Sequence, residues 1–171
     1  MADQQQDQKR MEKTQIVQLL KDNARIGNDE IAERLEMDTQ QVTSLIKEME
    51  EERTILGYNT LVNEENLGQE PVHAIIEVEV APERDSGFDR VARLISGFPE
   101  VRTLHLLSGT YDLSLEVTGR SLQEVAFFVA SKLSLIEGVR STRTHFLLKK
   151  YKEAGFVFHE EEEYERLKVA P

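Results

Sequence analysis

The sequence contains no cysteine and no long apolar segment. Without thiols it forms no disulfides, no thiolate nucleophile and no thiolate zinc site, which fits a reducing compartment. No stretch approaches the roughly 18 consecutive apolar residues that a membrane helix needs, and the polar start MADQQQDQKR lacks the apolar segment of a secretion signal. We therefore expect a cytoplasmic protein that makes no use of a membrane.

Positive charge is also scarce, because 21 Lys and Arg stand against 32 Asp and Glu and give a formal net charge of −11. Indiscriminate binding to nucleic acid needs a basic surface that releases counterions from phosphate, so the charge balance argues against it. It leaves open a local surface that reads a groove, because net charge governs solubility and steering rather than fold.

Signals of catalysis are weak. The four histidines, His73, His105, His145 and His159, are scattered without the spacing of metal ligands or of a catalytic triad. His73 and His145 could approach each other if the first and last strands pair, but each is interpreted as an ordinary strand residue. We expect no enzyme activity, no metal and no cofactor.

Three short helical patterns occupy the first third of the chain. Residues 1–11, rich in Gln and Asp, show no apolar period and are predicted to be a disordered leader. Asn28 is a candidate N-cap of the second helix, and Asp38 with Gln41 has the spacing of a capping box at the third. The apolar positions at helical spacing are Ile16, Val17, Leu19 and Leu20, then Ile31, Ala32 and Leu35, then Val42, Leu45, Ile46 and Met49. Helices this short must pack together, which predicts a helix-turn-helix.

The stretch 55–62 is rich in β-forming residues around a glycine. It predicts a small wing or an arm that pairs with another chain. We place a DNA-binding domain at 12–62 and a polar linker at 63–71.

From Val72 the apolar period changes from helical spacing to two, which predicts a strand that Pro82 ends. Helix and strand patterns then alternate in the order β-α-β-β-α-β up to about Tyr151. We place this ferredoxin-like domain at 72–153 and an acidic tail at 154–171. The fold class is therefore α+β, a winged-type helix-turn-helix followed by a βαββαβ sandwich.

Such a sheet carries both helices on one face. Ile75, Leu104, Leu106 and the run 146–148 are predicted to make the other face apolar as well. An open apolar face should not remain in water, so we expect a homodimer or higher assembly through it.

The corner 107–113 joins two predicted strands and places Gly109, Tyr111 and Asp112 together. A backbone free to take positive φ, an aromatic ring and an acceptor can form a small-ligand site, although an ordinary hairpin turn has the same composition.

Several motifs in the same order resemble the Lrp/AsnC family of transcription regulators, over about residues 12–153. They are KTQIVQLLKDNARIGNDEIAERLEMD, EMEEERTILGYNTLVNEENLG, LSGTYDLSLEV and IEGVRSTRTHFLLKKYKE. The resemblance implies a regulator that binds double-stranded promoter DNA and dimerises through its second domain, with tetramers or octamers built from dimers. It further implies a small effector, an amino acid, held between dimers by Gly109, Tyr111 and Asp112, with Thr142 and Thr144 from the last strand.

The third helix is the element expected to enter the major groove. Its outward positions are Gln40, Gln41, Thr43, Ser44 and Lys47. The resemblance implies arginines at the positions of Ser44 and Leu45, which this chain lacks, and residues 1–60 hold eight basic against thirteen acidic residues. We therefore expect weaker DNA binding than is usual for the family, with a shallow salt dependence. The alternative is an effector-sensing, oligomeric interaction protein that has lost DNA binding.

Overall fold

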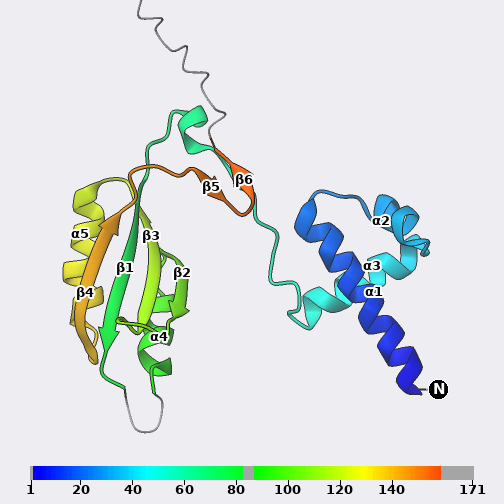
Figure 1. Cartoon of the computed structure of the whole chain (residues 1–171), viewed down its shortest axis with the longest axis horizontal. Helices are drawn as coiled ribbons and strands as arrows, with labels where there is room; N and C mark the ends of the chain where they lie inside the picture. Colours follow the sequence, from blue (N-terminus) through cyan, green and yellow to red (C-terminus); the bar gives the residue numbers. More distant parts are fainter. Residues whose placement is uncertain (1, 83–86, 159–171) are drawn as a thin grey trace, which may run out of the picture. The chain divides into compact units, whose positions relative to one another are not determined.

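The computed structural model describes residues 2–82 and 87–158 (Figure 1). The chain divides after Leu61 into two units, each with its own core. The predicted linker 63–71 belongs to the second unit, where Glu64–Leu67 form a short 3-10 helix, η1. Most of the predicted acidic tail at 154–171 lies outside the described residues, which end at Phe158.

The first unit is a bundle of three helices, α1 (Ala2–Asp22), α2 (Asn28–Leu35) and α3 (Thr39–Glu51). Its core uses the helical positions that the sequence predicts, namely Ile16, Ile31, Ala32, Val42, Leu45, Ile46 and Met49, joined by Ile26. Asp38 caps α3 as predicted, because its side chain accepts hydrogen bonds from the amides of Gln40 and Gln41. The N-cap of α2 is Gly27 rather than the predicted Asn28.

The prediction of a disordered leader at residues 1–11 is wrong, since α1 already begins at Ala2. Within it Lys9 reaches α3, where its Nζ lies 2.7 Å from a Glu48 carboxylate oxygen. Lys13 bridges the same Glu48 at 3.1 Å and Glu52 at 2.7 Å. These ion pairs join residues almost forty positions apart in sequence, so local periodicity could not reveal them.

The ion pairs shift the pKa values of their members in the directions that a mutual attraction requires. Hydrogen bonds from Lys9 and then Lys13 lower the pKa of Glu48, against a smaller opposing effect of burial. The hydrogen bond to Glu52 raises the pKa of Lys13. The lysines of α1 therefore neutralise part of the acidic end of α3.

The predicted wing at 55–62 contains no strand. A strand requires a neighbouring backbone to pair with, and no described segment of this chain pairs with it. Leu56 and Tyr58 are left 79% and 51% exposed.

The second unit contains a four-stranded antiparallel sheet in the order β2-β3-β1-β4, covered by two helices, as the βαββαβ prediction requires (Figure 1). The strands are β1 (Val72–Val80), β2 (Val101–Leu106), β3 (Leu113–Gly119) and β4 (Val139–Phe146). The helices are α4 (Asp89–Ser96) and α5 (Leu122–Ser131), and a 3-10 turn, η2 (Leu133–Leu135), follows α5. Ser121 caps α5 by accepting a hydrogen bond from the Glu124 amide.

The core lies between the sheet and the helices. It is lined by the alternate residues Ala74, Ile76, Val78 and Val80 of β1, together with Leu113, Leu115 and Val117 of β3. Alternation along β1 predicts these inward positions correctly, because successive strand residues point to opposite faces.

The prediction of an apolar open face is wrong. An irregularity between Val101 and Thr103 shifts the register of β2, so Leu104 pairs with Leu115 and Leu106 with Leu113 on the helix-covered face. Ile75 is left as an isolated apolar residue among polar neighbours on the open face, where His145 contacts Glu77 at 3.2 Å and Ser141 contacts Glu79 at 3.1 Å. The expected dimer contact through an apolar sheet face therefore loses its basis.

The last strand is shorter than predicted, because β4 ends at Phe146 and Leu148 is 97% exposed in the segment that follows. A small hairpin of β5 (Lys152–Glu153) and β6 (Phe156–Val157) comes next, at the start of the predicted tail. Leu147 donates its amide to the His73 carbonyl at 2.9 Å, which keeps the segment against the start of β1.

Gly138, just before β4, is the glycine whose replacement should cost most in the second unit. Its φ is +98°, and an added Cβ would lie 3.1 Å from Cγ2 of Val91. We expect Gly138→Ala to lower the free energy of unfolding by about 1–3 kcal/mol, through backbone strain and crowding. Gly109→Ala is the control, since nothing lies within 4 Å of its added Cβ. Equal unfolding midpoints in urea for the two variants would contradict this interpretation.

The ion pairs between α1 and α3 predict a dependence of stability on pH. The contribution of Glu48 is complete above the ordinary carboxyl pKa and is lost as the pH falls through its lowered pKa. That of Lys13 is complete below its ordinary pKa and is lost as the pH rises through its raised value. We expect Lys13→Gln to lower the urea midpoint of the helical circular dichroism signal at neutral pH and to reduce the drop on acidification.

Lys47→Gln is the matched control for that experiment, because Lys47 lies 3.8 Å from Glu51 with both side chains well exposed. An acid response of Lys13→Gln identical to that of the unmodified chain would show that these pairs add nothing to stability.

Candidate functional site

The outward face of α3 is the first candidate site. Gln40, Gln41, Thr43, Ser44 and Lys47 are all exposed, as predicted, while Val42, Leu45, Ile46 and Met49 fix the helix from the other side. Glutamine can pair with adenine, and lysine with guanine or phosphate. A rigid helix that carries such side chains outward can read the edges of bases.

Two of these polar side chains are oriented by residues outside α3. The Asn28 amide of α2 donates to the Thr43 hydroxyl at 3.0 Å, and the Thr43 hydroxyl itself donates to the Thr39 carbonyl at 2.8 Å. Gln41 donates to Glu12 of α1 at 3.0 Å. Asn28 is thus a positioning residue that the sequence suggested only as a helix cap.

The corner after β2 is the second candidate site, and Asp112 holds it together. A carboxylate oxygen of Asp112 accepts a hydrogen bond from the Val80 amide at 2.8 Å. The Asp112 amide donates to the Val78 carbonyl at 3.1 Å, and its carbonyl accepts from the Leu107 amide at 2.8 Å. Asp112 therefore joins the corner to the end of β1, and none of the described residues donates a hydrogen bond to its second carboxylate oxygen.

Gly109 does not use the conformational freedom that the sequence led us to expect. Its φ is not positive, and it is exposed with no atom within 4 Å of an added Cβ. Nothing in the described chain requires a glycine there. The residue leaves its backbone open to a molecule approaching from outside.

Tyr111 lies against Arg143 of β4, with 5.2 Å between the guanidinium carbon and the centre of the ring. Arg143 is exposed and pairs with Glu77 in the strand register, so both lie on the open face of the sheet. Arg143 was not among the predicted site residues. Its position between Thr142 and Thr144 could have indicated it, because residues alternate along a strand and Arg143 therefore points to the face opposite the two threonines.

Thr142 and Thr144 pair with Val78 and Ile76 and so point toward the helix-covered face, where both are half-buried. The structure therefore does not bring them together with Tyr111 and Arg143 on one face of a single chain.

The described residues were also compared with the requirements of a metal site, a paired-histidine site and a membrane-spanning helix. Among residues 2–82 and 87–158, no group of three or more His, Asp or Glu is arranged to hold a metal ion. His73 and His145 both lie on the open face but each contacts a different glutamate, Glu64 at 2.8 Å and Glu77 at 3.2 Å. No helix in the described part of the chain has the length and apolar character needed to cross a membrane.

Comparison with known proteins gives matches over both units. Residues 13–55 match a winged helix-turn-helix DNA-binding family, and residues 73–156 match the Lrp/AsnC ligand binding domain. The uncharacterised HTH-type transcriptional regulator YugG of Bacillus subtilis is 40% identical over 159 residues, which cover 92% of this chain and 96% of that protein. The leucine-responsive regulatory protein of Haemophilus influenzae is 25% identical, over 83% of this chain and 85% of that protein.

Solved structures show the same fold. The leucine response regulatory protein of Mycobacterium tuberculosis superposes with a TM-score of 0.70 at 19% identity, over 86% of this chain and 98% of that one. A transcriptional regulator of Neisseria meningitidis, solved as a complex with L-methionine, gives 0.65 at 25% identity, over 83% and 91%. With an Lrp/AsnC ligand binding domain behind a helix-turn-helix, and a relative 40% identical over nearly its whole length, the chain belongs to the Lrp/AsnC family of transcriptional regulators.

Proposed function

We propose that this regulator reads promoter DNA in the cytoplasm with the outward face of α3 and responds to an amino acid bound at the Gly109–Asp112 corner between dimers. The observation that carries the first half is the set of exposed polar side chains on α3, fixed from behind by a buried core and from the side by Asn28. The acidic residues of α3 speak against tight binding. The lysines of α1 reduce this obstacle, since Glu48 and Glu52 are both paired with them.

The ion pairs of Lys9 and Lys13 also limit the number of lysines that can contact DNA phosphates. Lys9 and Lys13 are engaged with carboxylates at 2.7 Å and are not free to neutralise DNA. Lys47 is the cation among the five proposed contact residues, and its contact with Glu51 is longer, at 3.8 Å, and well exposed. Each neutralised phosphate contributes about 0.9 to the slope of log K against log salt. We infer a small slope and a specificity that rests on the glutamines and Thr43.

DNA binding can be measured by fluorescence anisotropy on the gene's own promoter over a series of salt concentrations. We expect Gln40→Ala to weaken promoter binding by about 1–3 kcal/mol and to leave binding to random DNA unchanged, because a lost base contact affects only the specific complex. Lys47→Ala should weaken binding to both DNAs and flatten the salt dependence. Lys152→Ala, in the second unit, is the control.

The competing function is an oligomeric effector sensor without DNA binding, which the excess of acidic residues in the first unit favours. Binding of the promoter no tighter than random DNA, or no binding of either, would contradict our proposal and favour that function over it. A steep salt dependence would show that phosphate contacts outside α3 dominate.

The second half of the proposal concerns the effector. Gly109 leaves backbone groups accessible, and Arg143, held over Tyr111, offers a cation to an α-carboxylate. The second oxygen of Asp112 can accept from an α-ammonium group. Thr142 and Thr144 stay within the proposal as contacts from the helix-covered side of β4. Because the corner is exposed in a single chain, a second dimer would close the site.

Dimer formation has a separate candidate surface. The stretch 55–62 pairs with no strand among the described residues and exposes Leu56 and Tyr58, so the same stretch of a second chain is a suitable partner for it. We propose this pairing for the homodimer, from which tetramers or octamers can be built.

Gly109→Ala tests the corner without damaging the fold. With nothing near the added methyl group, we expect the free energy of unfolding to change by less than about 0.5 kcal/mol. The rise in melting temperature that an L-amino acid, with L-methionine as the first probe, produces in the unmodified chain should disappear. Gly27→Ala, in the first unit and outside the stretch 55–62, is the control, since nothing lies within 4 Å of its added Cβ. A full rise in Gly109→Ala would place the effector elsewhere.

A further inference from the structure

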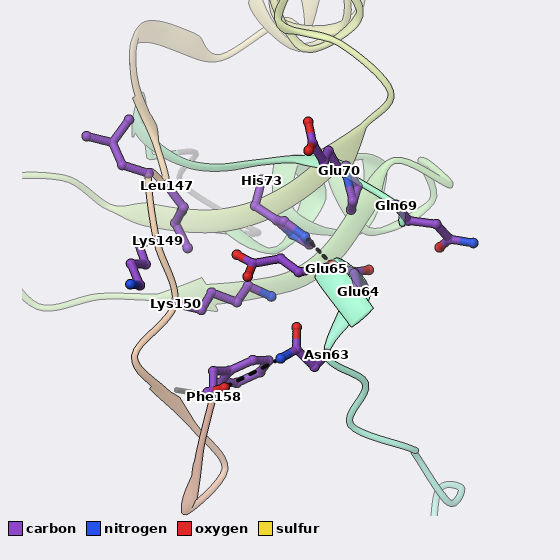
Figure 2. Close-up of a pocket in the computed structure, with 12 residues that line it drawn as sticks. Asn63, Glu64, Glu65, Gln69, Glu70, His73, Leu147, Lys149, Lys150 and Phe158 are labelled. Atoms are coloured by element: carbon purple, nitrogen blue, oxygen red, sulfur yellow. Dashed lines mark hydrogen bonds and ion pairs between the residues drawn. The ribbon is translucent and has the colours of Figure 1, made fainter. Parts of the chain in front are cut away.

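A cavity of about 320 Å³ lies at the opposite end of β1 from Val80, within the second unit (Figure 2). One wall is the segment that leads into β1, with Glu64, Glu65 and Glu70. The other wall is the segment that follows β4, with Lys149 and Lys150, and Phe158 lies at the edge. This volume is at the lower end of the range for small-molecule sites.

The frame of the cavity is fixed by hydrogen bonds. His73 binds Glu64 at 2.8 Å through Nε2 and the Thr118 hydroxyl at 3.3 Å through Nδ1, so both of its ring nitrogens are engaged. The Leu147 amide donates to the His73 carbonyl at 2.9 Å, and the Asn63 amide donates to the Phe158 carbonyl at 3.4 Å. These contacts hold the two walls without closing the space between them.

The charges on the two walls are opposite and do not neutralise each other. Glu65 and Glu70 have carboxylates with no hydrogen bond or ion pair among the described residues. Lys150 pairs instead with Glu153 at 3.1 Å, and the Lys149 ammonium lies 5.4 Å from the centre of the Tyr151 ring. Figure 2 shows Glu65 and Lys150 extending into the same space from opposite sides.

The lining of the cavity also includes apolar surface, from Pro71 and the half-buried Leu147. A ligand that matches this arrangement has an ammonium group at one end, a carboxylate at the other and an apolar body between them. An α-amino acid fits less well, because its two charges sit on one carbon atom.

We propose that this cavity binds a small zwitterion of the ω-amino acid class, with its ammonium group at Glu65 and Glu70 and its carboxylate at Lys149 and Lys150. The site is separate from the Gly109 corner. It includes the segment 63–71, which joins the sheet to the helix-turn-helix, so occupancy would restrain the connection between the effector domain and the DNA-binding domain.

The test uses 5-aminovalerate and its isomer L-valine, which share a formula but separate their charges differently. Titration of the full chain in the Gly109→Ala background, followed by calorimetry and by the NMR signals of the His73 ring, reports on this cavity alone. We expect 5-aminovalerate to bind at least about tenfold more tightly than L-valine, pentanoate or pentylamine, since each of these forfeits a charged contact.

Variants complete the experiment. Glu65→Gln and Lys150→Gln should each weaken 5-aminovalerate binding by about tenfold, while Lys150→Arg, which retains the charge and the pair with Glu153, should restore it. Glu137→Gln and Lys152→Gln are the matched controls outside the cavity. Absence of 5-aminovalerate binding, equal affinity for L-valine, or binding that ignores Glu65→Gln would each overturn the proposal. If Gly109→Ala abolishes the response to an α-amino acid and Glu65→Gln and Lys150→Gln have no effect on any ligand, the corner site is supported and the cavity site is rejected.

Discussion

The side chain of Asp112 continues the hydrogen-bond ladder between β1 and β3 beyond the last paired residues. The strands are in register from Val72 to Val78, where β3 begins at Leu113. One residue before that, Asp112 binds the Val78 carbonyl through its amide and the buried Val80 amide through its carboxylate. Because a buried amide without an acceptor costs about 1–3 kcal/mol, this contact decides how the corner meets the sheet.

The composition of the candidate effector site follows from that contact. With Asp112 turned toward β1, Gly109 stays at the exposed tip and Tyr111 lies over the open face, where Arg143 covers its ring. Arg143 is then an exposed charged group beside the corner, and one carboxylate oxygen of Asp112 is used to position the corner. The two threonines beside Arg143 point to the opposite face because strand residues alternate.

Local patterns in the sequence predicted much of this architecture. The period of two in β1 and the helical spacing in α3 identified their buried residues, since each pattern reflects one element facing one core. The motifs of the two domains also located the corner and the third helix. Asp38 was correctly predicted as the cap of α3.

Several of the failures depend on contacts between distant residues. The helical leader is held to α3 by Lys9 and Glu48, and the faces of Leu104 and Leu106 are set by one irregularity in the pairing of β2 with β3. The segment 63–71 joins the second unit through contacts such as that of Glu64 with His73. Neither periodicity nor composition reveals which distant residues will be in contact. The hydrogen bond between Asp112 and the Val80 amide is another contact of this kind.

The most direct test of the role of Asp112 is the hydrogen exchange rate of the Val80 amide, measured by NMR on the full chain without ligand. If Asp112 positions the corner, Asp112→Ala raises this rate by about tenfold or more, and Asp112→Asn, which retains an acceptor oxygen, raises it less. An unchanged Val80 rate in Asp112→Ala, together with a lost amino-acid response, would show instead that Asp112 acts on the ligand alone.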